Sequence, residues 1–245
     1  MTTGGPPGER RILARAPAAA GELVLRQAGP DFEIISNGVF LMDTRDGRSE
    51  RLLARAALDR CPAPAPGILI GGLGAGFTLA EAADEARAAR IDVVEISPEV
   101  IGWHHRYLRH ISGAALADRR VTVIRAGLAD WLAGGPGPYD IICLDVDNGP
   151  DWTVWDANRL LYRGEGLRRL AGSLTADGVL SVWSAAAAPA FQRRLRRWFG
   201  QVRAHRVAVA RGEPDVVYVA ARPRQARLRE RSRNRTPPDN CCIPG

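Results

Sequence analysis

The sequence predicts an α/β fold in which a doubly wound, largely parallel sheet follows a small N-terminal β lobe. Short apolar segments alternate with helical segments after Pro66, as expected for a sheet that has helices on both faces. A glycine-rich loop follows the first of these apolar segments, and an Asn37-Gly38 pair separates two strand-like segments nearer the N-terminus. These observations divide the chain into a lobe and a larger domain.

The lobe is expected within residues 21–62, as a β-hairpin unit with a linker helix. The Asn37-Gly38 pair favours a type I′ turn, because both central residues of that turn need positive φ. Ser49 is expected to cap a helix that precedes a proline-rich linker. Residues 1–20 begin with several glycines and prolines, and we expect them to be a flexible lead. The strands of the lobe are expected at residues 22–26, 32–35 and 39–42.

The larger domain is expected within residues 67–220, as a Rossmann-like, cofactor-binding catalytic domain. Its last two strands, 202–210 and 216–220, have no helical segment between them, so we expect an antiparallel hairpin at one sheet edge. That ending is typical of the class I methyltransferase fold and differs from that of dinucleotide dehydrogenases. The earlier strands are expected at 68–70, 91–95, 121–124, 139–144 and 179–183, and one of the intervening helices at 158–174.

The composition limits the class of protein. The chain is 46% hydrophobic and 25% charged, close to the average for soluble globular proteins, which excludes wholesale disorder. No apolar run reaches the ~18 residues of a membrane-spanning helix, and residues 1–10 lack the apolar core of a secretory signal. We therefore expect a cytoplasmic protein. All 34 basic residues are arginines, which excludes lysine Schiff-base chemistry.

The C-terminal residues 221–245 carry most of the net positive charge. They hold seven arginines against Glu230 and Asp239, whereas the formal charge of the whole chain is +7. We expect an Arg-rich, disordered, solvated tail, with binding of nucleic acid or an anionic membrane as the alternative. The cysteines and histidines show no metal-binding spacing, so no metal site is predicted.

The glycine loop contains Gly71, Gly72, Gly74 and Gly76, between an expected strand and an expected helix. Glycine lets the backbone approach a ligand closely, and the following helix N-terminus offers free N–H groups. The dinucleotide-binding fingerprint would need a further glycine at Phe77. The loop therefore predicts a cofactor site of another kind, with a tight structural turn as the alternative.

Glu95 ends the second strand of the larger domain. A carboxylate at this position can accept hydrogen bonds from both hydroxyls of a ribose. The alternative is that Glu95 caps the next helix through Ser97 and Pro98. Together with the glycine loop, Glu95 predicts a cofactor that contains a nucleoside.

An acidic loop follows the fourth strand and contains Asp145, Asp147 and Asp151. Ligands of open α/β sheets bind at the carboxyl ends of the strands. Carboxylates there can bind a cationic substrate, or remove a proton from an amine that attacks an alkyl group. A structural turn and a weaker metal-site interpretation are the alternatives. Trp152 and Trp155 either wall a substrate pocket or serve as packing residues.

Four segments together resemble the spermidine synthase (polyamine aminopropyltransferase) family: residues 35–42, 71–76, 93–100 and 139–145. The resemblance implies transfer of an aminopropyl group from decarboxylated S-adenosylmethionine to an amine (polyamine) acceptor, in a homodimer formed through the lobe. It adds Ile96, and Asp130 as the nearest acid after the third strand, to the expected cofactor-binding residues. It also implies that Asp145 and Asp147 are catalytic.

Four features differ from the family's pattern. Residues 126–129 lack the adenine-binding aspartate that the family has near the end of the third strand, which leaves Asp130 as the nearest acid. Gly74 replaces the aspartate that holds the aminopropyl amine, and Arg48-Ser49-Glu50 replaces a Tyr-His-Glu motif. Asn148 has the spacing of the family's catalytic aspartate, which leaves Asp147 to serve in its place. A methyltransferase that uses intact S-adenosylmethionine, and a non-catalytic protein that keeps the fold, therefore stay open as alternatives.

Overall fold

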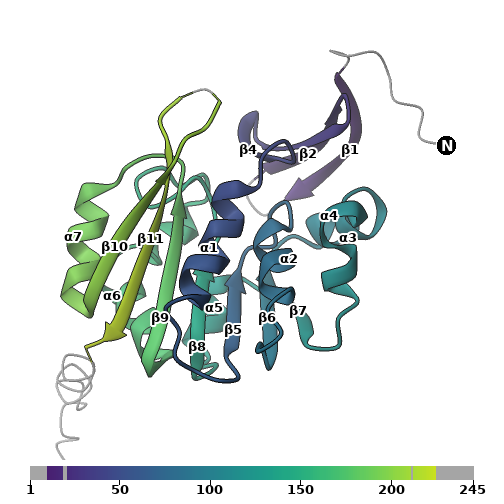
Figure 1. Ribbon diagram of the computed structural model, residues 1–245. Helices are drawn as coiled ribbons and strands as arrows, with labels where there is room; N and C mark the ends of the chain where they lie inside the picture. Colours follow the sequence, from purple (N-terminus) through teal and green to yellow (C-terminus); the bar gives the residue numbers. More distant parts are fainter. Residues whose placement is uncertain (1–9, 19–20, 211, 225–245) are drawn as a thin grey trace, which may run out of the picture.

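Two sheets form the framework of the chain in the computed structural model, which describes residues 10–18, 21–210 and 212–224. A four-stranded antiparallel sheet has the order β1-β2-β3-β4, and a seven-stranded sheet has the order β10-β11-β9-β8-β5-β6-β7. The small sheet lies over one end of the large sheet (Figure 1). The functional residues predicted from the sequence lie mainly at that end.

The small sheet comprises β1 (Arg10–Ala18), β2 (Gly21–Ala28), β3 (Asp31–Ser36) and β4 (Val39–Asp43). Asn37 and Gly38 have φ angles of 50° and 78°, which confirms the turn with positive φ between β3 and β4. The prediction of a flexible lead over 1–20 is wrong for β1, which pairs with β2 from Arg10 to Ala18. This edge strand has few large apolar side chains, so its backbone pairing left little pattern in the sequence.

The large sheet confirms the predicted fold class. Five strands run parallel: β5 (Gly67–Gly71), β6 (Arg90–Glu95), β7 (Val121–Arg125), β8 (Tyr139–Leu144) and β9 (Leu174–Ser184). β11 (Asp215–Pro223) is antiparallel to β9, and β10 (Phe199–Val207) is antiparallel to β11 at the edge. This is the arrangement expected for the class I methyltransferase-like fold.

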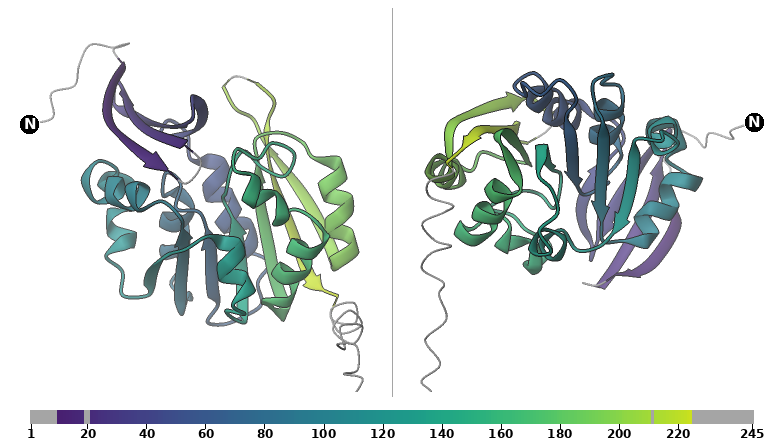
Figure 2. Two further views of the ribbon diagram at one scale, coloured as in Figure 1. Left: turned by 180° about the vertical axis from the view of Figure 1, so that it is seen from behind. Right: turned by 90° about the horizontal axis from the view of Figure 1, so that it is seen from below.

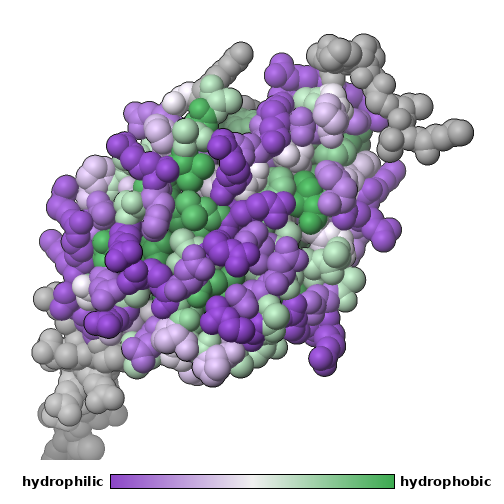
Figure 3. Space-filling model, viewed as in Figure 1, coloured by the Kyte–Doolittle hydropathy of each residue, from purple (hydrophilic) through white to green (hydrophobic). Residues whose placement is uncertain are grey.

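Helices cover both faces of the large sheet (Figure 2). Alternate residues of the strands face two apolar cores, as in Ile68 and Ile70 toward one and Leu69 toward the other. The first core includes α1 (Arg48–Leu58), α2 (Phe77–Ala83), α3 (Pro98–Arg106) and α4 (Arg109–Leu116). The second includes α5 (Leu128–Ala133), α6 (Gly164–Gly172) and α7 (Pro189–Trp198). Hydrophilic side chains cover most of the face seen in Figure 3.

Two helices differ from the sequence predictions. α1 begins at Arg48 after Gly47, and Ser49 does not cap it, because the Ser49 hydroxyl is engaged with Glu50 and Asp215. The helix expected at 158–174 is divided into the 3₁₀ helix η1 (Asp156–Leu160) and α6. α1 also packs against β9 and α2, so this helix joins the layer on the large sheet.

A buried carboxylate on β3 fixes the arginines of the lobe. The Glu33 side chain is 3% exposed and accepts a hydrogen bond of 2.6 Å from Arg26 Nε and another from Arg45. Burial alone would raise the pKa of Glu33, but the hydrogen bonds from Arg45 and Arg26 bring the pKa below its usual value. Glu33 therefore joins β2, β3 and the segment after β4.

We expect Glu33→Gln to lower the free energy of unfolding by about 2 kcal/mol, because two arginines lose their charged partner in a buried position. Glu22→Gln is the matched control, since Glu22 pairs with Arg15 at 2.7 Å on the same sheet but is 48% exposed. Its effect should be at most about 0.5 kcal/mol. Urea unfolding of both variants tests this, and equal effects would contradict it.

Candidate active site

Two adjoining cavities lie between the lobe and the carboxyl ends of β5, β6 and β8. The smaller has a volume of about 80 Å³ and is lined by Gly72, Gly74, Glu95 and Ile96 together with lobe residues. The larger has a volume of about 940 Å³. Four residues line both cavities: Leu41, Met42, Asp145 and Asp147. The structure therefore brings together most of the residues that the sequence selected.

Gly72 and Gly74 are the two loop glycines that line the smaller cavity. Gly72 has a φ of +88°, and a Cβ there would overlap the backbone carbonyl of Asp145. A Cβ at Gly74 would lie 3.4 Å from Met42 Sδ and 3.6 Å from Asp145 Oδ2, which is ordinary contact. A side chain at position 74 would thus face both the lobe and Asp145.

Gly71 and Gly76 support the loop from behind and are not among the residues that line the two cavities. A Cβ at Gly71 would overlap the Leu128 side chain, and one at Gly76 would lie 2.7 Å from Ser112 Cβ. Tight packing explains why glycine is needed at both positions. The sequence pattern alone could not distinguish these glycines from the two that line the cavity.

A buried histidine holds the glycine loop in place. His104 Nε2 lies 2.9 Å from the Gly74 carbonyl, and Nδ1 lies 2.6 Å from Ser112 Oγ. Burial lowers the pKa of His104 to about 4, so the imidazole is neutral at neutral pH. Because a carbonyl can only accept, Nε2–H donates to Gly74 and Nδ1 accepts from the Ser112 hydroxyl. Sequence reasoning missed His104, since its role depends on packing between α3 and the loop.

Glu95 lies at the base of the smaller cavity. Its carboxylate accepts hydrogen bonds from Leu73 N at 2.9 Å and Ser97 N at 2.8 Å, and burial raises its pKa. Each oxygen keeps lone-pair capacity for a further donor, such as a ribose hydroxyl. The side chain of Ser97, not Glu95, accepts from Val100 N at 3.2 Å as the cap of α3.

The other two predicted cofactor residues lie at one side of this cavity. Ile96 is 39% exposed and lines the cavity. Asp130, in α5, is not among the lining residues. A Cβ at Gly127 would lie 3.1 Å from the Asp130 carboxylate and 3.8 Å from Ile96 Cδ1, so Asp130 is a near neighbour of the cavity wall.

Asp145 and Asp147 differ in how their carboxylates are occupied. Asp145 is partly buried and accepts a hydrogen bond of 2.7 Å from Thr78 Oγ1; desolvation raises its pKa to about 6, with a further contribution from the charges of Glu95 and Asp215. Asp147 accepts from Trp155 N at 3.2 Å and from Asn158 Nδ2 at 2.8 Å. Asp147 therefore stabilises its own loop, whereas Asp145 keeps an oxygen toward the shared wall of the cavities.

Glu50 and Asp215 join this site through Ser49. The Ser49 hydroxyl lies 2.8 Å from Glu50 Oε2 and 2.7 Å from Asp215 Oδ2, and it accepts from Trp183 Nε1 at 3.0 Å. Because the hydroxyl has one proton, it can donate to only one carboxylate, so the second contact needs a protonated carboxyl. Burial, reinforced by the charge of Asp145, raises the pKa of Glu50 to about 7. Burial also raises the pKa of Asp215, so Glu50 and Asp215 share this proton through Ser49.

Acidic groups dominate the lining of the larger cavity. Two arginines, Arg10 and Arg45, face seven carboxylates: Asp43, Asp46, Glu50, Asp145, Asp147, Glu213 and Asp215. Phe40, Trp152 and Trp183 add aromatic surface to the same cavity. This combination of negative charge and apolar surface suits an organic cation with an alkyl chain.

Comparison with known proteins gives relatives in one family, although no protein-family model matches the chain. The polyamine aminopropyltransferase of Prochlorococcus marinus (strain MED4) is 26% identical over 153 residues, 62% of this chain and 52% of that protein. That of Corynebacterium efficiens is 35% identical over 130 residues, 51% of this chain and 24% of that protein. The chain spans about half the length, or less, of these two relatives.

Two solved structures share the fold. A spermidine synthase in complex with the transition-state analogue AdoDATO has a TM-score of 0.73 at 18% identity, covering 86% of this chain and 74% of that one. The Thermotoga maritima spermidine synthase has a TM-score of 0.71 at 19% identity, covering 86% and 73%. The chain is therefore similar, over part of its length, to polyamine aminopropyltransferases, and it shares the fold of the spermidine synthases. Among the described residues, no helix is long and apolar enough to cross a membrane.

The departures from the aminopropyltransferase pattern lie around the two cavities. Gly74 faces Asp145, and Glu50 lines the larger cavity. Asn148, at the spacing of the family's catalytic aspartate, is 5% exposed, and its Nδ2 lies 3.4 Å from the Phe40 carbonyl. In the sequence, Glu50 was noted only as the last residue of the segment that replaces the Tyr-His-Glu motif. Asp215 had no sequence signal, because only the antiparallel return of β11 brings it beside α1.

We expect the free energy of unfolding to fall as the pH rises from about 4.5 to about 7. Folded Glu50 titrates at about 7 against an ordinary value of 4.5, so the folded state binds more protons than the unfolded state in this interval. Glu50→Gln should flatten this part of the profile. Urea unfolding at a series of pH values measures it, and an unchanged slope in the variant would refute the assignment.

Proposed function

We propose that the chain is an aminopropyltransferase that moves the aminopropyl group of decarboxylated S-adenosylmethionine to an amine, with a polyamine as the acceptor class. The observation that carries the proposal is the position of Asp145, on the wall shared by a nucleoside-type cavity and a strongly acidic cavity. An electrophile held in the first cavity and an amine held in the second would meet beside this carboxylate.

The residues around the smaller cavity fit the co-substrate. Glu95 would hold the ribose hydroxyls, and Gly72 and Gly74 would let the backbone approach the chain that carries the sulfonium. Ile96 would pack on the adenine, with Asp130 nearby at the edge. Bound decarboxylated S-adenosylmethionine supplies a carbon next to a sulfonium, which an amine can attack. The 80 Å³ cavity is small for the whole molecule, so we expect the lobe to shift on binding.

The acidic residues would bind and deprotonate the acceptor. An ammonium group must lose its proton before its nitrogen can attack, and a carboxylate with a pKa near neutrality suits this transfer. Asp145, with a pKa of about 6, is our candidate for the base, and Glu50 and Asp215 would hold the cationic chain. In the transfer the new N–C bond forms as the S–C bond breaks, methylthioadenosine leaves, and the proton goes to Asp145. Asp147 would keep the loop in position.

Several finer statements belong to the same proposal. A homodimer formed through the lobe is supported by the resemblance and by Ile12 and Phe40, which are each 47% exposed on the small sheet. A cytoplasmic location stays a prediction. The tail predicted at 221–245 is wrong for its first residues, because β11 continues to Pro223. Nucleic-acid binding through the Arg-rich tail stays a prediction, since residues 225–245 lie outside the described residues.

The second candidate function is methyl transfer from intact S-adenosylmethionine. Gly74 favours it, because no side chain at this position can bind the amine of an aminopropyl group. Asp145 lies close to the same position and offers a carboxylate for that amine, which is why we prefer aminopropyl transfer.

Thermal stabilisation by the two co-substrates, measured side by side, tests the proposed function. A ligand at ~100 times its dissociation constant should add about 2.7 kcal/mol to the free energy of unfolding. We expect a larger shift with decarboxylated than with intact S-adenosylmethionine. The opposite order would favour the methyltransferase, and no shift with either would favour a non-catalytic protein.

Substitution of the two loop aspartates tests the catalytic assignment. We expect Asp145→Asn to lower turnover at least about 100-fold, because the base is lost. Asp147→Asn keeps an oxygen that can accept from Trp155 N, and it should lower turnover less than about tenfold. Co-substrate binding and thermal unfolding of both variants serve as controls for folding. A loss in Asp147→Asn that equals or exceeds that in Asp145→Asn would move the base to Asp147.

A further inference from the structure

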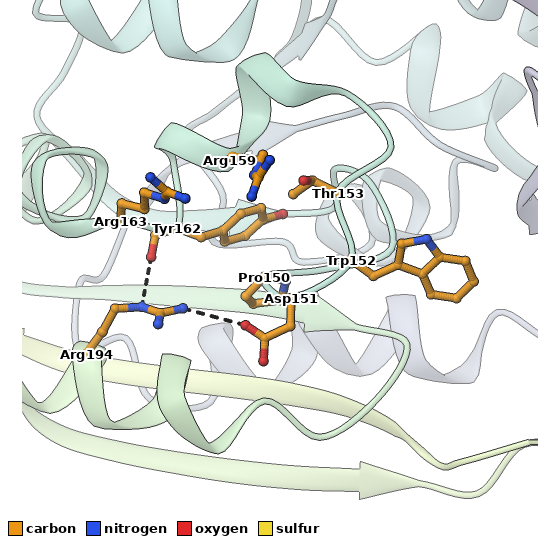
Figure 4. Close-up of a pocket in the computed structure, with 8 residues that line it drawn as sticks. All are labelled: Pro150, Asp151, Trp152, Thr153, Arg159, Tyr162, Arg163 and Arg194. Carbon is orange, nitrogen blue, oxygen red and sulfur yellow. Dashed lines mark hydrogen bonds and ion pairs between the residues drawn. The ribbon is translucent and has the colours of Figure 1, made fainter.

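A third cavity, of opposite charge, adjoins the acidic one. It has a volume of about 420 Å³, and Arg159, Arg163 and Arg194 line it together with Asp151 and Trp152. Trp152 also lines the acidic cavity and is 56% exposed. Figure 4 shows the Trp152 ring pointing away from the three arginines, which lie around the other end of the cavity. The loop that contains Trp152 therefore separates a basic cavity from an acidic one.

Arg194 is held in a defined position within the basic cavity. Its Nε donates to the Tyr162 carbonyl at 3.2 Å, and its guanidinium lies 5.7 Å from the centre of the Phe191 ring. Tyr162 is itself anchored, since its hydroxyl donates to the Val146 carbonyl at 2.7 Å. Figure 4 shows Arg194 extending from α7 toward the loop, so its guanidinium is oriented before any ligand binds.

The charges in the cavity do not balance. Asp151 is the one acidic residue among those that line it, lies 3.7 Å from Arg194 and is 56% exposed, so Arg163 and Arg194 share a single solvated carboxylate. Arginine presents N–H groups in a planar fork that matches the oxygens of a carboxylate or a phosphate. A polyamine would be repelled here, which sets this cavity apart from the one beside Asp145.

We propose that the basic cavity binds the oxyanion, a carboxylate or phosphate group, of a small molecule. The cavity is larger than a single phosphate group needs, so the remainder of an organic ligand has room beside it. Arg159 follows Asn158, whose amide holds Asp147 at 2.8 Å. A ligand bound to Arg159 would thus contact the short segment, η1, that holds the acidic loop in position. Because Trp152 lines both cavities, the oxyanion would lie near the amine site.

Calorimetric titration with inorganic phosphate and pyrophosphate, at constant ionic strength, tests the proposal on the full chain. Arg163→Gln should weaken binding about tenfold, because one charged hydrogen-bond donor is lost. Asp151→Asn should strengthen it, because the internal counter-charge is removed. Arg193→Gln is the matched control: Arg193 is exposed on α7, next to Arg194 but outside the cavity, and its removal should leave affinity unchanged.

Arg163→Gln should weaken anion binding and Asp151→Asn should strengthen it. These opposite changes in affinity distinguish a local site from general unfolding or charge screening. Absence of binding by either anion would overturn the proposal. Equal weakening in Arg163→Gln and Arg193→Gln would also overturn it, since a diffuse surface potential would then account for the affinity. These titrations need no turnover, so their outcome is independent of the proposed function.

The oxyanion could belong to the acceptor or to a separate anion, and a comparison of two acceptors distinguishes these sources. This experiment rests on the proposed function. Ornithine and putrescine differ by one carboxylate and form a matched pair. If the acceptor carries the oxyanion, ornithine should be used in preference to putrescine, and Arg163→Gln should abolish that preference. If a separate anion binds, the two acceptors should be equal while the phosphate titrations stay positive. Failure of both acceptors with intact phosphate binding would reject aminopropyl transfer to these amines and leave the anion site standing.

Discussion

Close contact between the loops after β5 and β8 is the constraint on which the site depends. Asp145 N donates to the Gly71 carbonyl at 2.8 Å, and Gly72 leaves no room for a Cβ against the Asp145 carbonyl. This contact turns the Asp145 side chain toward Thr78 and the shared cavity wall. The glycine loop and the acidic loop are therefore one structural unit, supported from behind by His104.

The acidic side chains of this unit lie close together, so their mutual repulsion lowers the stability of the folded chain. Asp145 and Glu50 are both partly buried, and desolvation raises the pKa of each. Two ionised carboxylates in such a position repel each other, which favours a proton shared between Glu50, Ser49 and Asp215. A bound cation would favour ionisation of both groups. Cation binding and proton release are therefore coupled by the same burial that raises the pKa values.

Local signals made much of the fold and half of the site predictable. Asn37 and Gly38 specify their turn through two positive φ angles, and Glu95 follows from its place at a strand end. β1 was missed, because pairing of an edge strand depends on backbone hydrogen bonds more than on its side chains. Asp215 lies 166 residues from Ser49 in sequence, so no local pattern could join them. Gly71 and Gly76 match the loop pattern, but tertiary packing determines their role.

Under the proposed function, a different set of carboxylates supplies the negative charge that the family's pattern would place in the site. Gly74 and Asn148 each lack a carboxylate that the family's pattern would place in the site. Asp145 lies beside the first position, where a Cβ at Gly74 would be 3.6 Å from its Oδ2, and Glu50 and Asp215 add charge from α1 and β11. The negative charge needed for an ammonium group is thus present, although it comes from different elements. Because these carboxylates come from different elements, we expect them to select the amine by a different arrangement of hydrogen-bond acceptors.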